Sequence, residues 1–594
     1  MNPSRIKATA PLFVLAAVIV GAMALALYWV FLVPIFQAPD EVEHFDYAVN
    51  LYTAGRLIRL SEPVHAWNTN KYGRHVYTDY LVRATNTQSL MFKYGVKEPP
   101  DYGTRQYYAD LDRNAPGEFP GTVDLQPREP WGMSVLYPYG YYAVLAIWMK
   151  VVSIFSKRMT VLFFGARIFS VVLLGCSLLL TYGTFRELRF SKWRSVLVTA
   201  AVGFFPLTTF VSSYVQADNL SMTLVMLACY LALRFKREPD SILLLVGLAL
   251  ALGLLFVTKH HFYFAVLIPV LCMVIAVQLS RRQRIGVWVR TIAILMAPAL
   301  ILGGVELWVV YGSEAGLAKV NAHFGHTDLI TGNTNGGHGE LVQAWAQGKM
   351  AAARFLVQGL GLAFSNFYLN RHTSLTGSTF QSFWGDFGWM DTPLIIRTPW
   401  KTGVIRNFLA VVNVIVFGLV LTRLFQVGLR LLRIARRGRW RRALMVACSN
   451  PMLNAYFIFA IFMFCVFALV KGHFGPQGRN WYPFVPAIFM VAMWYAPRAL
   501  PWKHISNTIG NLVLVGLLLY CAVGSYYAIP SIVDRFYNPN ATKVPYGLVV
   551  PNEGGPIAPL QPHCNALASF NADHEVELML GSFLCSVGPE SLTL

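Results

Sequence analysis

Several ionisable side chains crowd the end of a long apolar segment near the N-terminus. The stretch FQAPDEVEHFDY contains Asp40, Glu41, Glu43, His44 and Asp46. Asp40 after a proline, with Glu43 three residues later, has the pattern of a helix N-cap and capping box, which explains two of these acids without any chemistry. Glu41 and His44 share a helix face beside an apolar boundary, where charged side chains are costly. A partly desolvated carboxylate at such a boundary suits general-base catalysis, with His44 as a supporting group.

A second acid, Asp218 in SYVQADNLSM, lies between two apolar blocks. Asp-Asn also favours a simple turn. If Asp218 meets Asp40 and Glu41 at one membrane face, the acids form either a base with an orienting partner or a metal site. A divalent cation such as Mg²⁺ or Mn²⁺ would suit the second arrangement, and the sequence leaves both open.

Cations recur at the ends of other apolar blocks. Lys259 and His260 follow one block, and Arg479 closes the sequence GPQGR before another. Such residues can simply extend toward lipid phosphates. Arg479 follows a glycine-rich turn, and a guanidinium held there suits bidentate binding of a phosphate, so we expect these three side chains to bind an anionic partner.

Aromatic residues accompany acids in two further stretches. QSFWGDFGWMDTP contains Trp384, Asp386 and Trp389, and WGMSVLYPYGYY contains Tyr137 and Tyr139. A membrane-interface belt explains such aromatics. Flat aromatic faces beside carboxylates also bind sugars, so we expect these residues to support or bind a substrate.

The composition predicts a polytopic helical membrane protein. Of the 594 residues, 55% are hydrophobic and 13% are charged, and the apolar residues come in long blocks. The net charge of +20 does not indicate nucleic acid, because the basic residues cluster between apolar blocks as the positive-inside rule predicts. The first block, residues 12–36, is too long for a signal peptide and lacks a cleavage site, so we expect a retained helix.

Eleven spans are predicted, with the N-terminus cytoplasmic and the C-terminus outside. The stretch Tyr141–Phe155 is placed along the outer interface, because counting it as a span puts the basic cluster RLLRIARRGRWRR outside. The two large outer loops are then about residues 34–157 and 312–403. The spans are approximately Leu12–Val33, Val161–Phe185, Ser195–Val215, Leu220–Leu233, Ser241–Phe256, Phe262–Leu279, Val289–Tyr311, Val404–Leu424, Leu453–Val470, Tyr482–Ala496 and Ile505–Ile529.

We divide the chain into a transmembrane domain, residues 1–528, and an extracytoplasmic tail, residues 529–594. Six of the eight cysteines lie in apolar blocks, whereas Cys564 and Cys585 lie in the polar tail. An oxidising compartment would allow this pair to form a disulfide. With this topology the acidic, aromatic and Arg479 motifs all reach the same outer face.

The order of these motifs resembles the GT-C superfamily of integral membrane glycosyltransferases. The likeness rests on PDE…H after the first span, YPYGYY before the interfacial helix, GARIFS in the second span and ADN after the third. With FGWMD and QGRNWYP added, the chain resembles more closely a family of bacterial polytopic membrane proteins of uncharacterised function related to that superfamily. The likeness extends from residue 34 to about residue 486. Tyr137-Pro138-Tyr139 stands where many members have His-Pro-Pro.

The resemblance implies a GT-C-like bundle in a bacterial plasma membrane and an inverting sugar transfer on its outer face. The donor would be a polyprenyl-phosphate sugar, the acceptor an envelope glycan or lipid, and no nucleic acid would take part. Asp40 and Glu41 would match the catalytic carboxylate position, and Asp218 the second acidic position. Arg479, with Lys259 and His260, would hold the donor phosphate.

Two other functions share these features. A transporter or flippase of lipid-linked sugars would need charges near the midplane and broken helices, whereas the middle regions of the predicted spans carry almost no charge, with Glu306 as the main exception. A glycan polymerase or ligase with a diphosphate-linked donor would use the same outer site. The sequence separates it poorly from a monosaccharide transferase.

Overall fold

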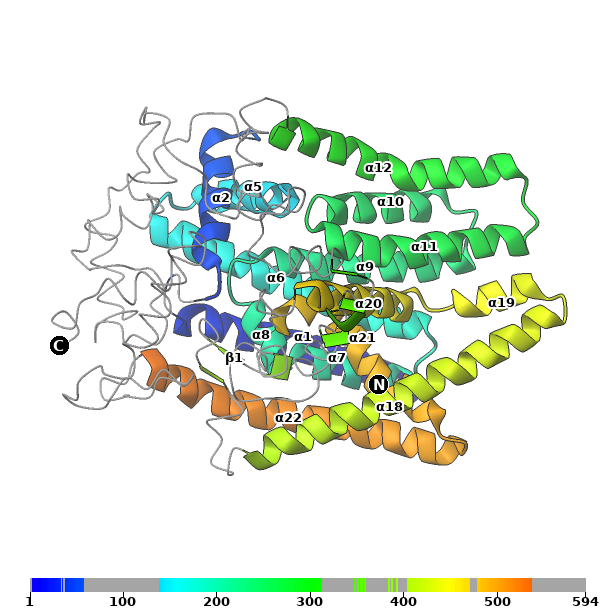
Figure 1. Cartoon of the computed structure of the whole chain (residues 1–594). Helices are drawn as coiled ribbons and strands as arrows, with labels where there is room; N and C mark the ends of the chain where they lie inside the picture. The colour runs from blue at the N-terminus through cyan, green and yellow to red at the C-terminus, as the bar shows by residue number, and fades with distance from the viewer. Residues whose placement is uncertain are drawn as a thin grey trace.

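The chain folds into a bundle of long apolar helices (Figure 1). The structure is a computed structural model that describes residues 3–33, 35, 38–57, 138–311, 347–348, 350–351, 353–355, 357–358, 383–384, 386–387, 392–393, 403–470 and 478–536. Seven helices in these ranges are long and apolar enough to cross a membrane, or eight if one bent pair counts as one span. The prediction of an all-α polytopic membrane protein is therefore confirmed.

The long helices are α1 (Pro3–Leu32), α6 (Met159–Glu187), α9 (Ala217–Arg237), α11 (His260–Ser280), α12 (Ile285–Tyr311), α18 (Gly403–Arg436) and α22 (Lys503–Phe536). The helix α22 continues past the domain boundary predicted at residue 528. The central helices are α6, α9 and α11, since about 70% of each apolar window is buried in the bundle, compared with 6% for α18. Most of α18 therefore faces outward.

Other predicted spans are shorter or irregular. The predicted span Ser195–Val215 is broken before Pro206 into α7 (Lys192–Gly203) and α8 (Pro206–Val211), because proline cannot continue a helical hydrogen-bond ladder. The helix α10 (Ile242–Phe256) has only 15 residues. The helix α19 (Trp440–Ala447) bends by 76° into α20 (Pro451–Val470).

The predicted span Tyr482–Ala496 is a mixture of helix types. It comprises the 3-10 helix η3 (Gly478–Phe484), α21 (Val485–Met490), the π-helix η4 (Val491–Tyr495) and the 3-10 helix η5 (Ala496–Ala499). Strand structure in the described residues is limited to β1 (Asp386–Phe387) and β2 (Thr392–Pro393), paired antiparallel with Asp386 opposite Pro393.

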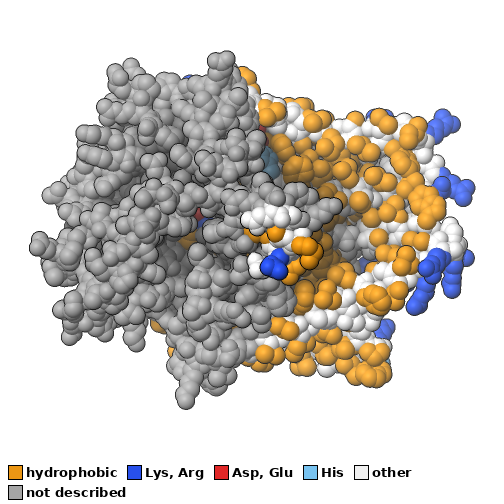
Figure 2. All heavy atoms as spheres, in the orientation of Figure 1, with side chains coloured by type: hydrophobic (Ala, Val, Ile, Leu, Met, Phe, Trp, Pro, Cys, Tyr) orange, Lys and Arg blue, Asp and Glu red, His pale blue; other side chains and the backbone are white. Residues whose placement is uncertain are grey.

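The two ends of the bundle differ in charge. At one end, which we name the basic end, ion pairs Arg237–Glu187 and Arg281–Asp240 join the ends of α6, α9 and α11. Lysine and arginine side chains gather at this end in Figure 2. At the other end, which we name the polar end, the starts of α9 and α11 meet through an ion pair between Asp218 and Lys259. Successive helices thus bring motifs that are distant in sequence together at the polar end.

The helix α5 (Gly140–Ser153) begins and ends at the polar end. Gly140 N–H donates to the Val257 carbonyl at 2.6 Å, at the end of α10. Trp148, late in α5, donates to the Gly165 carbonyl near the start of α6 at 2.8 Å. The helix therefore does not cross the bundle, in agreement with the prediction for Tyr141–Phe155. A Cβ at Gly140 would lie 2.6 Å from the Val257 oxygen, so only glycine allows this approach.

Candidate functional site

Asp40 and Arg479 form the first ion pair of a buried cluster at the polar end. Asp40 immediately precedes α2 (Glu41–Ala54) in a left-handed conformation (φ 57°), which aspartate tolerates better than most residues. Its side chain makes no capping bond to the helix. Instead the carboxylate accepts a short hydrogen bond from Arg479 at the start of η3, and Arg479 also donates to the Pro39 carbonyl at 3.1 Å. Asp40, which the sequence predicts as a helix cap, is thus the ion-pair partner of Arg479, which the sequence predicts to bind phosphate.

Asp218 and Lys259 form the second ion pair. Asp218 is fully buried in the first turn of α9, where the helix dipole favours a negative charge. Its Oδ1 lies 2.5 Å from Lys259 Nζ, whose residue immediately precedes α11. Its Oδ2 is buried and has no hydrogen-bond partner among the described residues. Because an unsatisfied buried carboxylate oxygen is costly, this atom is an available acceptor for a hydroxyl or amide of a ligand.

His44 interacts electrostatically with members of both ion pairs: Asp40, Arg479 and Lys259. Its Nδ1 is 2.6 Å from the Tyr142 hydroxyl, and its side chain also hydrogen-bonds Gln216. Burial lowers the pKa of His44 to about 3, with Lys259 and Arg479 acting in the same direction against Asp40. The imidazole is therefore neutral at physiological pH. It adds hydrogen bonds to the cluster without adding a charge.

The charges of the cluster compensate one another. Burial would raise the pKa of Asp40, but the charges of Arg479 and Lys259 and the hydrogen bond from Arg479 outweigh it, and the pKa is lowered. Asp40 is therefore ionised at neutral pH. We name Asp40, His44, Asp218, Lys259 and Arg479 the polar cluster; two carboxylates face two cations in it. Each cation of the cluster is paired with one carboxylate: Arg479 with Asp40, and Lys259 with Asp218.

Glu41 has a different environment from the one predicted for a catalytic base. Both its oxygens bind Arg167, at 2.7 Å from Nε and 2.6 Å from Nη2, and Oε1 also accepts the Val215 N–H at 3.1 Å. Both side chains are completely buried. These donors occupy both oxygens and the side chain is shielded from solvent, so a substrate hydroxyl does not reach the carboxylate. Glu41 therefore ties α2 to α6 and to the α8–α9 connection, which positions Asp40 next to it.

Arg167 is part of the motif GARIFS, but no role was predicted for it from the sequence. Arg167 lies early in the predicted span Val161–Phe185 and is fully buried. It also donates to the carbonyls of Val30 and Val33 at the end of α1, at 2.8 and 2.5 Å. An arginine within an apolar block is the sequence signal that could have indicated a buried acidic partner.

His260, predicted to bind the donor phosphate, instead contacts Glu306. Its Nε2 lies 3.1 Å from Oε2 of Glu306 on α12, and its ring is 4.7 Å from that of Phe256. Glu306 also acts electrostatically on Tyr139, whose hydroxyl donates to the Leu302 carbonyl at 3.3 Å. His260 and Tyr139 thus anchor α11 and α5 to α12, beside the polar cluster.

The predicted aromatic residues are only partly described. Trp384 is buried against Phe205 and Tyr520, with ring centroids 6.0 and 5.0 Å away, so it packs α22 onto the break between α7 and α8. Asp386 is described only as a backbone position in β1. Tyr137 and Trp389, like Cys564 and Cys585, lie outside the described residues.

A divalent metal does not fit the donor set of the polar cluster. Asp40 and Asp218 each bind a cationic side chain, and the described ranges contain no group of three or more histidine, cysteine, aspartate or glutamate residues suited to a metal ion. The positive charges of Lys259 and Arg479 already balance both carboxylates, so the cluster has little negative charge left to hold Mg²⁺ or Mn²⁺. We therefore derive no step through a metal.

Residues 23–486 match the family model described as Predicted membrane protein (DUF2142). The chain belongs to this family. The matched range contains all five residues of the polar cluster, and it includes Arg479 only seven residues from its end. No curated protein matches the chain. In this DUF2142 protein the cluster also contacts three residues that were not selected from the sequence: Tyr142 and Gln216 hydrogen-bond His44, and Tyr214 hydrogen-bonds Arg479. They flank selected residues in YPYGYY and SSYVQADN.

Proposed function

We propose that this DUF2142 protein is a membrane glycosyltransferase that moves a sugar from a polyprenyl-phosphate donor to an envelope glycan or lipid acceptor. The observation that carries the proposal is the polar cluster. Two carboxylates and two cations from four distant segments converge at the membrane-boundary end of an apolar bundle, and Asp218 Oδ2 has no described partner. A phosphate and a hydroxyl are the groups that such an arrangement would bind.

The donor phosphate would bind Arg479 and Lys259, which are the cations of the cluster. By taking hydrogen bonds from Arg479, the phosphate releases the Asp40 carboxylate from its partner. The charge that lowers the pKa of Asp40 is then shared with the phosphate, so the pKa rises and the carboxylate becomes a better base. Binding of the donor thus prepares the proton acceptor.

The transfer itself is one displacement. The acceptor oxygen attacks the anomeric carbon from the side opposite the phosphate, and its proton passes to Asp40. The bond from the anomeric carbon to the phosphate oxygen breaks, and the electron pair leaves with the phosphate, whose charge Arg479 and Lys259 stabilise. Asp218 Oδ2 accepts a hydrogen bond from a sugar or acceptor hydroxyl. The configuration at the anomeric carbon inverts.

The distribution of charge between the two ends supports one orientation of the bundle in the membrane. The basic end carries the lysine and arginine clusters (Figure 2), and the positive-inside rule therefore favours a cytoplasmic location for this end and for the N-terminus. The polar cluster then opens to the outer side of the plasma membrane. A prenyl chain would remain in the bilayer while its sugar phosphate reaches the cluster.

One observation favours a second function, a flippase for lipid-linked sugars. The residues from η3 to η5 change from 3-10 to α, π and again 3-10 geometry, and irregular helices of this kind are typical of transporters. The ionic residues of the cluster lie at one end of the bundle, however, and a flippase would use them at the midplane. The same protein preparation tests both functions.

The decisive experiment uses purified full-length protein in nanodiscs with radiolabelled polyprenyl-phosphate sugars and a crude envelope glycan acceptor. The variants are Asp40→Asn, Asp218→Asn and Arg479→Lys. The control is Asp240→Asn, which removes a carboxylate paired with an arginine at the basic end. We expect Asp40→Asn to reduce transfer by a factor of about 10² to 10⁴, as for loss of a general base, while donor binding is retained.

Arg479→Lys is expected to weaken donor binding, and Asp240→Asn to leave both measurements unchanged. If no donor in the panel is transferred while proteoliposomes translocate a labelled sugar lipid, the flippase is the function. Equal transfer by wild type and Asp40→Asn would remove Asp40 as the base. Equal losses in Asp40→Asn and Asp240→Asn would mean that the assay reports folding.

A further inference from the structure

A second polar site lies at the basic end, far from the polar cluster. It is a pocket of about 700 Å³, bounded by the connection from α6 to α7, by η4 and η5, and by α22. Its lining contains Arg189, Arg194 and Arg498 but no aspartate or glutamate. This volume is within the range of small-molecule sites. Three positive charges without an acid in the lining favour the binding of an anion.

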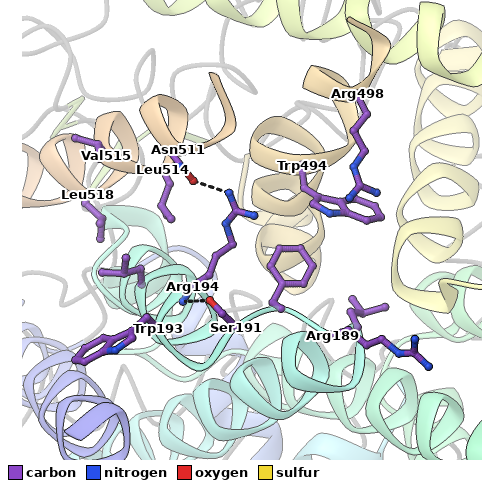
Figure 3. Close-up of a pocket in the computed structure, with 13 residues that line it drawn as sticks. Arg189, Ser191, Trp193, Arg194, Trp494, Arg498, Asn511, Leu514, Val515 and Leu518 are labelled. Atoms are coloured by element: carbon purple, nitrogen blue, oxygen red, sulfur yellow. Dashed lines mark hydrogen bonds between the residues drawn. The ribbon is translucent and has the colours of Figure 1, made fainter. Parts of the chain in front are cut away.

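The arginines are held in place by neutral neighbours. Figure 3 shows Arg194 extended to Asn511 on α22, whose Oδ1 accepts its hydrogen bond. Arg498 lies over the Trp494 ring, with its guanidinium carbon 3.8 Å from the ring centroid. Arg194 repels Arg498 electrostatically, and so does Arg423 behind it. Because neither contact neutralises a charge, both guanidinium groups keep their full charge for a ligand.

The rest of the lining is apolar and continues onto the lipid-facing surface. Leu514 and Leu518 line the inner wall, whereas Trp193, Leu197 and Val515 line the pocket and are also 49, 41 and 52% exposed. A soluble anion would not need such a wall. A ligand with one charged end and an apolar body would fill both parts.

We propose that this pocket binds the phosphate headgroup of an anionic membrane lipid. The phosphate lies between Arg194 and Arg498, close to the first turn of α7, where the helix dipole favours an anion. The acyl chains follow Leu197, Val515 and Leu518 into the bilayer. The lipid joins η5 and α22 to α7, so it stabilises the basic end independently of the function of the polar cluster.

The test measures lipids retained by the purified full-length protein in native mass spectrometry. The probes are phosphatidylglycerol, phosphatidylcholine with the same acyl chains, and inorganic phosphate as competitor. The test variant is Arg194→Gln with Arg498→Gln. The control variant is Arg284→Gln with Arg437→Gln, which removes two exposed arginines of the basic end that do not line the pocket.

We expect the wild type to prefer phosphatidylglycerol, and the pocket variant to bind it at least about tenfold more weakly, from the loss of two charge-assisted contacts. The control should change this affinity less than about twofold, because exposed charges act weakly. Equal affinity for both lipids, or equal losses in the two double variants, would overturn the proposal. Displacement of the lipid by equimolar inorganic phosphate would also overturn it, since the site would then recognise free phosphate.

A third variant keeps the test independent of the arginines. Val515→Trp fills the apolar part of the pocket without changing any charge, and its position is half exposed to lipid, so the fold tolerates it. We expect it to weaken phosphatidylglycerol binding about fivefold or more, as overfilling of a packed site does. Unchanged binding in this variant would show that the lipid binds the charged surface outside the pocket. Thermal midpoints of all variants establish that the folded proteins are compared.

Discussion

Removal of one partner from the buried pair Glu41–Arg167 should be among the most destabilising changes in the bundle. Arg167→Met deletes two hydrogen bonds to Glu41 and two to the carbonyls of Val30 and Val33. It leaves a fully buried carboxylate with the Val215 N–H as its remaining described donor. From this geometry we expect a loss of about 3 to 5 kcal/mol in the free energy of unfolding.

The two single changes should not add. Glu41→Met leaves the Arg167 charge buried with the Val30 and Val33 carbonyls as its described acceptors, which also costs about 3 to 5 kcal/mol. Glu41→Met with Arg167→Met removes both charges, and its remaining cost is that of unsatisfied backbone groups, about 1 to 3 kcal/mol each. The double variant should therefore be more stable than the sum of the single variants by about 2 kcal/mol.

The assay is SDS-induced unfolding of the purified protein in mixed micelles, with wild type, both single variants and the double variant measured together. Arg281→Met at the exposed pair with Asp240 is the control and should cost less than about 1 kcal/mol. A coupling energy below about 1 kcal/mol for Glu41 and Arg167 would refute the reasoning. The pair would then be solvated, and Glu41 would again be a candidate base.

Two further predictions concern the surroundings of the polar cluster. The folded pKa of His44, about 3, lies below the unfolded value of 6.5, so its contribution is fully present above pH 6.5 and is lost as the pH falls toward 3; unfolding at pH 5 should be easier than at pH 8 by about 2 kcal/mol. His44→Gln should flatten this profile between pH 7 and pH 5, and an unchanged profile would assign the pH dependence to other groups. Gly140→Val should displace α5, because the new Cβ lies 2.6 Å from the Val257 oxygen, and should cost about 1 to 3 kcal/mol in SDS unfolding. Gly286→Val, where a Cβ meets open space, is the matched control, and an equal cost in both would mean that helix propensity alone is measured.

The membrane architecture was predictable because long apolar blocks and basic clusters are direct consequences of the bilayer and its charge asymmetry. The convergence of Asp40, Asp218, Lys259 and Arg479 followed from the same topology, since each residue ends an apolar block at one face. The composition does not predict where a helix is interrupted. The break before Pro206 was marked by its proline, whereas the π-helix η4 has no sequence signal of this kind.

The pairing of the site residues was not predictable. The pattern of Asp40 and Glu43 indicated a capping box, yet Asp40 binds Arg479, which is 439 positions away. Glu41 and His44 share a helix face, but the first binds Arg167 and the second Tyr142. Side-chain partners depend on how α2 rotates against α6 and α5, and no local pattern records that rotation.

The separation of 439 positions between Asp40 and Arg479 also orders events during synthesis. At about 5 to 20 residues per second, the ribosome reaches Arg479 roughly 20 to 90 s after Asp40. Arg167 is synthesised only 126 positions after Glu41, or about 6 to 25 s later. Asp40 is therefore without its Arg479 partner while most of the helices are synthesised. The charge balance of the polar cluster is one of the last things that biogenesis completes.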